Sequence, residues 1–403
     1  MVVAPQPRSG RIAQLDALRG MAVIGIVWMN VHVFALPVQA YYNPLAWGGD
    51  TALDRLVWAA SFVFVEDKFR GLFALLFGAG CLILFDRGRA ASGVAGAWRA
   101  HYARMAVLFA IGLVHAILFA NNDILRAYAL AGCALPLLAP LAPRALVAVA
   151  IGLMVLHVAA GLVTFGGGIH DWYAGRMASD ASFFMERNFG VDPAAVSFML
   201  ERGQESFGER VARRVQGIPA QLSAIGASLP LNLSAIALGM ALWRGGMLAG
   251  RWRTFRLQRL AAVCALVALP ALLGLAWYVA ESGFPGALTG AAGLVLSAPF
   301  DLLLALAYAA LAMALFTPGG RATKMLAAVG RLSLTNYLMT SIILAAIFAS
   351  WGLGLFGTVS RAQGFAIGFV PILAMLAWSP PWVARFGQGP FERLWRGVSG
   401  LLG

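Results

Sequence analysis

The sequence predicts an all-α polytopic membrane protein with about ten transmembrane helices. Hydrophobic residues make up 61% of the 403 residues and charged residues only 12%, whereas soluble domains carry about 25% charged residues. Long apolar segments recur along the whole chain, and arginines gather between them. These three observations point away from a soluble domain and indicate a chain that crosses a bilayer several times.

Ten apolar segments come close to the ~20 residues that a helix needs to cross the hydrocarbon core. They cover approximately residues 15–38, 57–85, 102–120, 125–141, 145–164, 219–243, 258–280, 287–316, 332–350 and 364–384. The second and eighth segments are longer than one crossing requires, so we expect them to be tilted or broken. Pro299 is a candidate kink in the eighth.

The distribution of positive charge predicts that both termini lie on the cytoplasmic side. With the N-terminus inside, the cytoplasmic connections hold Arg87, Arg89, Arg99, Arg104, Arg144, Arg244, Arg251, Arg253, Arg256, Arg259, Arg321, Lys324, Arg331, Arg385, Arg393 and Arg396, and the other side receives Asp50, Asp54, Asp123 and Glu281. Membrane proteins retain arginine and lysine on the cytoplasmic side. The same rule accounts for the net charge of +13, so no nucleic-acid partner is expected.

One long polar stretch divides the chain into three parts. Residues 1–163 hold the first five segments, residues 164–215 form an extracytoplasmic insert, and residues 216–403 hold the last five segments. Acidic and basic residues of the insert nearly balance and are interspersed with Phe183, Phe184 and other apolar side chains. We therefore expect amphipathic helices that either cap the outer mouth or lie on the lipid surface.

The cysteines give no sign of a disulfide or a metal site. Cys81, Cys133 and Cys264 lie in separate apolar segments, and the sequence contains no CxxC motif or Cys/His cluster. We expect no metal and interpret all three as small apolar packing residues.

Polar groups follow one stripe of the first apolar segment. At about 100° per residue, Arg19 and Asn30 fall within roughly 20° of each other on a helix, and Asp16 lies about 40° from Asn30. Such groups are costly in lipid and usually face protein or water. We expect Asp16 and Arg19 to brace the cytoplasmic end of this helix and Asn30 to line a cavity.

The third segment carries a candidate catalytic pair. His115 is expected in its outer half, and Asp123 at the outer rim. An imidazole can accept a proton from a nucleophile while a carboxylate orients its ring. A structural histidine on a membrane helix is the alternative interpretation.

The second segment enters the membrane through the charged sequence Glu66-Asp67-Lys68-Phe69-Arg70. Asp67 and Arg70 are three residues apart and can pair on a helix. Four charges this close to an apolar run indicate an aqueous recess, and an interfacial ion-pair cluster is the alternative.

The last two segments before the C-terminal span hold further polar candidates. Asn336 lies on a polar stripe with Ser333 and Thr340, next to Tyr337. Asn336 and Tyr337 are candidate substrate-binding residues, although interhelical hydrogen bonding explains such a stripe equally well. Asp301 is expected to form a structural ion pair with an arginine of another segment, and Arg331 is counted among the structural polar residues.

Four motifs follow one another in an order that is specific when they are taken together. They are Leu15-Asp16-Ala17-Leu18-Arg19-Gly20 with Gly25-Ile26 and Asn30, Lys68-Phe69-Arg70 with Leu72-Phe73-Ala74-Leu75-Leu76-Phe77-Gly78-Ala79-Gly80, Gly112-Leu113-Val114-His115 with Asp123-Ile124-Leu125, and Gly330-Arg331-Leu332-Ser333-Leu334-Thr335-Asn336-Tyr337 with Gly352-Leu353-Gly354-Leu355. These motifs resemble the YeiB family of bacterial inner-membrane proteins. The resemblance implies a multi-pass protein of the bacterial inner (plasma) membrane.

The N-terminal half is also similar to transmembrane acyltransferases, which include heparan-α-glucosaminide N-acetyltransferase and the O-acyltransferases of surface polysaccharides. This resemblance implies that an acyl group passes from a cytosolic coenzyme A thioester to an acceptor across the membrane, with an outer histidine as base. The chain departs from the O-acyltransferases at Asn30, where they carry a histidine. His115 is the substitute candidate, by location.

The resulting hypothesis is a transmembrane acyltransferase with acyl-CoA as donor and a small-molecule, glycan or lipid acceptor. His115 is the expected base, Asp123 orients it, and Asn30 or Asn336 donates to the oxyanion. The cavity is expected to be lined by Asn30, Asp67, Arg70, His115, Asp123 and Asn336. Arg251 to Arg259 could grip phosphates, although topology alone predicts arginine there.

Two other classes of function remain open. A transporter or flippase of a small or lipidic solute would use the same buried polar groups for binding and alternating access. A non-catalytic scaffold would contain only paired polar groups and no cavity. Membrane lipids are expected partners in each case, and a homo-oligomer is possible.

Overall fold

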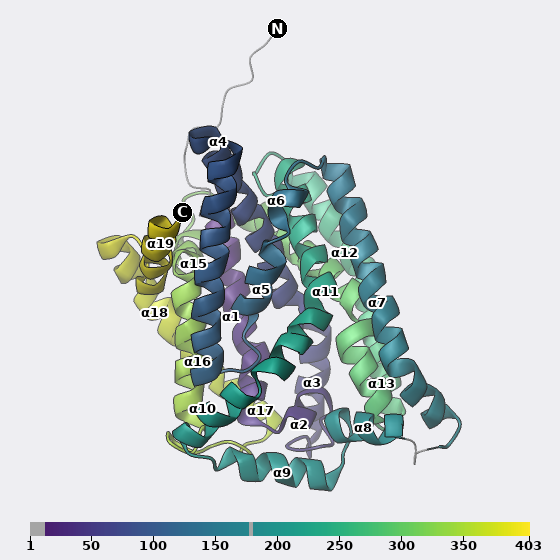
Figure 1. Ribbon diagram of the computed structural model, residues 1–403. Coiled ribbons are helices and arrows are strands. Elements are labelled where there is room, and N and C mark those ends of the chain that lie inside the picture. The colour runs from purple at the N-terminus through teal and green to yellow at the C-terminus, as the bar shows by residue number, and fades with distance from the viewer. Residues whose placement is uncertain (1–12, 177–179) are drawn as a thin grey trace.

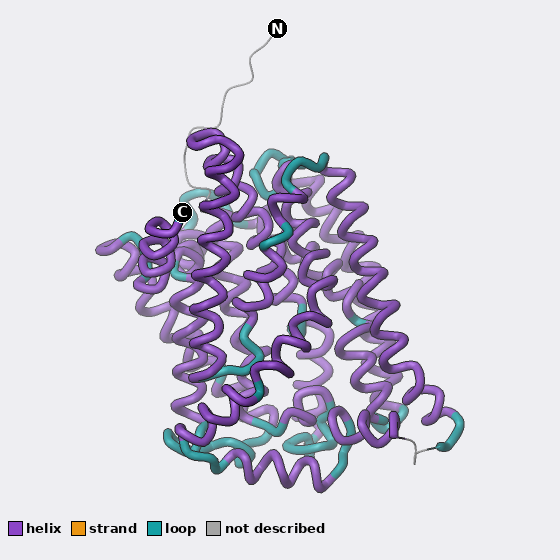
Figure 2. Tube along the Cα trace, viewed as in Figure 1, coloured by secondary structure: helices purple, strands orange, loops and turns teal. Residues whose placement is uncertain are grey.

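The computed structural model describes residues 13–176 and 180–403, and these residues form helices and connecting loops without a strand (Figures 1 and 2). The helices are α1 (Ala13–Ala35), α2 (Val38–Tyr42), α3 (Ala52–Phe64), α4 (Lys68–Leu118), α5 (Ile124–Gly132), α6 (Leu135–Leu138), α7 (Pro143–Tyr173), α8 (Asp180–Phe189), α9 (Pro193–Gly203), α10 (Phe207–Gln216), α11 (Ile218–Arg244), α12 (Thr254–Glu281), α13 (Gly286–Ala291), a π-helix (Ala292–Leu296), α14 (Ala298–Leu315), α15 (Arg321–Arg331), α16 (Ser333–Phe348), α17 (Arg361–Ile367), α18 (Phe369–Phe386) and α19 (Pro390–Leu402). The expected all-α membrane protein is confirmed.

Seven helical stretches of the described chain are long and apolar enough to cross a membrane, or eight if α15 and α16 form one span bent by 77°. The stretch Ala52–Leu118 counts once here but contains two of the expected segments. Gly93 interrupts α4 with a φ of 73°, a conformation that glycine adopts without steric cost. Gly88 then lies beside Ala97, so the two parts of α4 run back along each other. The count of ten spans stays a prediction.

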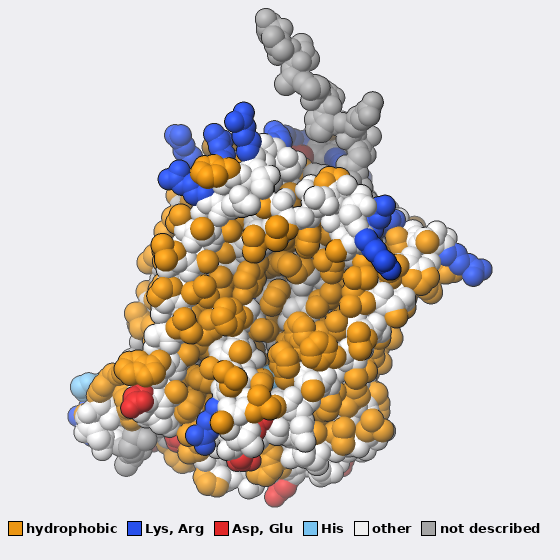
Figure 3. Space-filling view, turned by 180° about the vertical axis from the view of Figure 1, so that it is seen from behind, with side chains coloured by type: hydrophobic (Ala, Val, Ile, Leu, Met, Phe, Trp, Pro, Cys, Tyr) orange, Lys and Arg blue, Asp and Glu red, His pale blue; other side chains and the backbone are white. Residues whose placement is uncertain are grey.

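Charge is distributed unequally between the two ends of the molecule. Figure 3 shows Lys and Arg gathered at the end that holds the α4 turn, which we call the basic end, and most visible Asp and Glu at the other end. Apolar side chains cover the surface between them, and α7 exposes large ones such as Val163 and Val155. An apolar belt of this extent is a lipid-facing surface. The basic end is the expected cytoplasmic side, and that orientation stays a prediction.

Helices α8, α9 and α10 lie across the opposite end, which we call the cap end (Figure 1). The expected insert 164–215 begins later than the sequence suggested, because α7 continues to Tyr173. Polar contacts fix these helices to the bundle. Arg214 donates to the carbonyl of Leu118 at 2.6 Å, and Gly286 N–H donates to Glu186 at 2.9 Å. The insert therefore caps the bundle, which was one of the two arrangements considered. Residues 177–179 of the predicted insert lie outside the described part of the chain.

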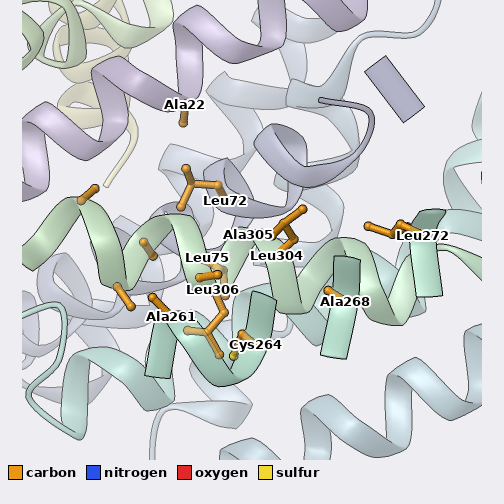
Figure 4. Close-up of a cluster of buried hydrophobic side chains, with 14 of the residues drawn as sticks. Ala22, Leu72, Leu75, Ala261, Cys264, Ala268, Leu272, Leu304, Ala305 and Leu306 are labelled. Carbon is orange, nitrogen blue, oxygen red and sulfur yellow. The ribbon is translucent and has the colours of Figure 1, made fainter. Parts of the chain in front are cut away.

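The scaffold depends on tight helix contacts. Helix α14 lies between α4 and α12, where Leu304, Leu72 and Cys264 belong to one buried apolar cluster (Figure 4). Helix α1 contacts α15 through Gly20 and Gly330. Small residues let helix backbones approach closely in membrane proteins, which gives a physical reason for glycine in the first and last motifs.

Gly330→Ala is expected to lower the stability of the protein by about 1–3 kcal/mol. A Cβ atom at Gly330 would lie 1.8 Å from the backbone oxygen of Asp16, so α1 and α15 would have to separate. Thermal unfolding in detergent checks this. Gly274→Ala in α12 is the control, because a Cβ atom there meets nothing within 4 Å. Equal unfolding midpoints for the two variants would contradict the close contact.

Candidate functional site

A break in the second membrane segment positions the first group of site residues. Helix α3 ends at Phe64 and α4 begins at Lys68, and Asp67 between them has a left-handed backbone with a φ of 58°. For any residue other than glycine, a left-handed backbone has a cost in free energy. A Cβ atom at Gly25, near the middle of α1, would meet the ring of Phe69 at 2.1 Å. The break therefore lies near the mid-depth of the bundle rather than at its surface.

One buried and one half-buried ion pair surround this break. Lys68 Nζ lies 2.6 Å from Asp301 Oδ1, and the Lys68 side chain is fully buried. Arg70 Nε donates to Asp67 Oδ1 at 2.6 Å, as the sequence spacing suggested. The partner of Asp301 is thus a lysine and not the expected arginine, because the break places Lys68 at the first turn of α4, against α14.

A narrow recess of about 10 Å³ lies between α4, α11 and α14. Its polar lining consists of Asp67, Arg70, Asn232 and Asp301, and small or apolar side chains form the rest. Arg70 Nη1 donates to Asn232 Oδ1 at 3.0 Å. The neighbouring helices are irregular here, since Pro230 lies inside α11 and the π-helix precedes α14. Interrupted helices around buried polar groups are typical of binding sites in membrane proteins.

Arg361 is a buried charge that the sequence analysis did not single out. Its side chain is fully buried, and Nη2 donates to the carbonyls of Ala40 and Tyr41. Nε and Nη1 of Arg361 and Oε1 of Glu66 have no hydrogen-bond partner among the described residues. An arginine close to the cap end departs from the expected excess of arginine at the basic end. This departure is the sequence signal that could have identified Arg361.

Tyr41 and Tyr42 of α2 lie within electrostatic range of Glu66 and Asp67. Burial, and then the negative charges of Glu66 and Asp67, raise the pKa of Tyr41 well above its usual range. Burial, and then Asp67 and Glu66, also raise the pKa of Tyr42. Both phenols are therefore protonated and able to donate hydrogen bonds at neutral pH.

His115 and Asp123 form a second group, near the cap end of α4. His115 Nδ1 lies 2.6 Å from Asp123 Oδ2, and both side chains are buried. Asp123 is the N-cap of α5, where Oδ1 accepts from the backbone N–H of Arg126 at 3.0 Å. Tyr337 Oη donates to Asp123 Oδ2 at 3.2 Å. The structure therefore brings together His115, Asp123 and Tyr337, and it holds the carboxylate by three separate groups.

The other imidazole nitrogen of His115 is the chemically open atom of this group. His115 Nε2 is buried and has no hydrogen-bond partner among the described residues. With Nδ1 donating to the carboxylate, Nε2 carries the lone pair that can accept a proton. Gly112 makes room for the pair, because a Cβ atom there would lie 2.6 Å from Asp123 Oδ1.

Asn336 does not belong to either group. Its Nδ2 donates to Val329 O at 3.0 Å and to Ser379 Oγ at 3.1 Å, and its Oδ1 accepts from Trp378 at 2.9 Å. These bonds use its polar atoms to join α15, α16 and α18 at the bend between α15 and α16. These bonds fit the alternative of interhelical hydrogen bonding, and the substrate-binding role of Asn336 stays a prediction.

Three of the predicted structural polar residues, Asp16, Arg19 and Arg331, lie near the basic end. Arg19 Nη1 pairs with Asp16 Oδ1 at 3.1 Å, and the Arg19 guanidinium lies over Gly80. Arg331 Nη2 donates to the carbonyl of Gly387 at 2.8 Å. The contacts of Asp16 and Arg19 are consistent with their expected role, which is to brace this end of α1.

The expected single cavity is divided. The recess is lined by Asp67 and Arg70 but not by Asn30, His115, Asp123 or Asn336. Tyr128 separates the groups, because it stacks on Phe73 and Phe77 and donates to the carbonyl of Arg70 at 2.8 Å. Asn30 is half-buried on α1, one turn beyond Ile26, which packs with Tyr337. Aromatic packing that the sequence pattern does not specify is the physical reason for the division.

The fold and these two groups define an all-α membrane protein with ionisable side chains buried inside the bundle. The chain belongs to the YeiB family. It is 33% identical over 394 residues to "Uncharacterized protein YeiB" of Escherichia coli (strain K12), across 96% of this chain and 95% of that relative. It is 27% identical over 419 residues to "Uncharacterized protein YxaH" of Bacillus subtilis (strain 168), across 98% and 96%.

Residues 242–401 match a family described as "Protein of unknown function (DUF418)". No solved structure matches the chain. The resemblance to the YeiB family that the four motifs suggested is therefore confirmed.

Proposed function

We propose that the chain is a transmembrane acyltransferase of the bacterial inner membrane, which moves an acyl group from a cytosolic coenzyme A thioester to an extracytoplasmic or lipidic acceptor. The observation that carries the proposal is the buried His115–Asp123 pair, with a 2.6 Å contact at Nδ1 and an unpartnered Nε2. A base that is oriented by a carboxylate and shielded from water is the arrangement that proton abstraction from a hydroxyl or amine requires.

The proposed step balances without a further reactant. His115 Nε2 takes the proton of the acceptor hydroxyl or amine as its oxygen or nitrogen bonds to the thioester carbonyl carbon. The tetrahedral intermediate then loses the carbon–sulfur bond, and the imidazolium returns the proton to the departing thiolate. Asn30 is the remaining candidate donor to the oxyanion, because the polar atoms of Asn336 are already bonded. Asp67 and Arg70 would bind a polar part of the acceptor in the recess.

Asp123→Asn is expected to lower the rate of acyl transfer by about 10²- to 10⁴-fold. The amide can donate to Nδ1 and so leaves the proton on Nε2, the atom that must accept. Transfer is measured in proteoliposomes as release of free thiol from acetyl-CoA, with an amino sugar and a bacterial lipid extract as acceptors. Asp50→Asn is the matched control, since Asp50 is exposed. Equal rates for the two variants would count against the proposal.

A solute transporter is the second candidate, and the broken helices around the recess favour it. A membrane segment interrupted at Val65–Asp67, which packs against the helix that follows a π-helix, resembles the discontinuous helices that transporters use at mid-depth. Transport of a solute requires no thioester. A wild-type protein that moves a solute across vesicles and releases no thiol from acetyl-CoA would replace the first candidate with this one.

A further inference from the structure

A hollow of about 340 Å³ lies at the basic end, between α4 and the C-terminal helix α19. Arg87 and Arg104 reach it from the two antiparallel parts of α4, and Arg396 reaches it from α19. We call it the arginine groove. Trp395 also lines it and fixes α19 in place, because its Nε1 donates to the carbonyl of Arg104 at 3.0 Å.

The charged side chains that line the arginine groove are three arginines, and Gly403, which also lines it, accepts from Arg99 Nε at 3.0 Å. The described residues around the hollow include no Asp or Glu. Two neighbouring carboxylates have partners outside the groove, since Asp86 pairs with Arg89 at 3.6 Å and Glu392 accepts from the backbone N–H of Leu334 at 2.8 Å. Three guanidinium groups around one hollow focus a positive potential there and attract anions. Charge asymmetry of the loops accounts for arginine at this end, but it does not account for three arginines that converge on one hollow.

We infer that the arginine groove binds the phosphate groups of an anionic ligand, supplied either by a coenzyme A thioester or by the headgroup of an anionic lipid. Guanidinium groups match phosphate oxygens in charge and in hydrogen-bond geometry. The indole of Trp395 offers an aromatic surface to a nucleotide base. For the lipid, α19 exposes Leu394 toward the surroundings at the same end.

The coenzyme A branch rests on the proposed function, and the position of the groove supports it. The second part of α4 leads from Arg104 to His115. Eleven helical residues span about 16 Å, a distance that an extended phosphopantetheine arm can cover. The residues Arg251, Arg253 and Arg256, which the sequence analysis considered for this task, are exposed and do not line the groove.

The test compares Arg104→Gln/Arg396→Gln with Arg144→Gln/Arg321→Gln in the full chain. Both double variants remove two positive charges, but Arg144 and Arg321 are exposed and lie outside the groove. Binding of coenzyme A is measured by calorimetry in a neutral detergent. Binding of phosphatidylglycerol is measured as thermal stabilisation relative to phosphatidylcholine, since a ligand of the folded state raises apparent stability. Arg87→Gln is a further variant, because an exposed side chain can be replaced without disturbing packing.

We expect the groove variants to weaken one of the two ligands by about tenfold or more, and the control to bind like the wild type. Loss of coenzyme A affinity identifies the thioester, and loss of phosphatidylglycerol stabilisation identifies the lipid. The inference is overturned if the wild type binds neither probe, if the groove variants bind both unchanged, or if the control loses as much affinity.

The two proposals fail separately. Normal coenzyme A affinity in the groove variants, together with acyl transfer by the wild type, would remove the groove and leave the acyltransferase. Reduced affinity in the groove variants, with a wild type that transfers no acyl group, would leave the phosphate site and remove the acyltransferase.

Discussion

His115→Ala is expected to lower the rate of acyl transfer by about 10²- to 10⁴-fold, the usual contribution of a positioned base. The substitution removes Nε2, the atom that takes the acceptor's proton in the proposed step, and it leaves Asp123 held by Tyr337 and by the N–H of Arg126. The loss should appear in kcat rather than in KM, because the interaction is made in the transition state. Free-thiol release from acetyl-CoA in proteoliposomes measures it.

His170→Ala provides the matched control, because His170 is exposed at the end of α7. Thermal unfolding of both variants separates lost chemistry from lost folding, and His115→Gln retains a polar group beside Asp123 if the alanine variant is unstable. A folded His115 variant that transfers acyl groups at the wild-type rate would remove the base assignment and return His115 to a structural role.

The pairing of His115 with Asp123 was accessible from the sequence because both residues flank one short connection. Helix α4 ends at Leu118 and α5 begins at Ile124, so the chain reverses between them. Aspartate at an N-cap position is a common way to start a helix, and here the cap faces the histidine. Short-range geometry of this kind follows from spacing and helix-end chemistry.

The separation of the remaining candidates was not accessible in the same way. Helical spacing gives the direction of a side chain but not the element that it meets. Asn336 meets Ser379 and Trp378, which lie about forty residues further along the chain. Lys68 meets Asp301 across 233 residues, and the reason is a helix break whose exact place the apolar pattern of residues 57–85 does not reveal. Long-range partners depend on packing among α4, α14 and α18.

Charge asymmetry gave the most transferable signal, and its exceptions are informative. The loops at the basic end follow the expected excess of arginine, whereas Lys68, Arg126 and Arg361 are buried elsewhere in the bundle. Each of these three has a carboxylate within electrostatic range, namely Asp301, Asp123 and Glu66 respectively. These three positive residues inside the bundle therefore mark buried charges with a carboxylate close by, and such groups in membrane proteins are candidates for function.

Lys68→Met is expected to destabilise the protein by about 3–5 kcal/mol. The side chain is fully buried and its ammonium lies 2.6 Å from Asp301 Oδ1, with a further donation to the carbonyl of Phe62. Methionine fills a similar volume but leaves Asp301 buried without its counter-charge, and a buried unpaired carboxylate is far more costly than a buried pair. The unfolding midpoint in detergent measures the loss.

Lys68→Met/Asp301→Asn should recover most of the lost stability, because the double variant contains neither an unpaired carboxylate nor an unpaired ammonium. The matched control is Arg89→Met, which breaks the exposed pair with Asp86 and should change stability by less than about 1 kcal/mol. Additive effects of the two substitutions at Lys68 and Asp301 would contradict a direct pair. A stable double variant also separates the candidate functions. The acyltransferase should keep its kcat when this pair is removed, because the proton is taken at His115, even if the KM for an acceptor bound in the recess changes. A transporter that relies on the charge of Asp301 in the recess should lose solute movement with its fold intact.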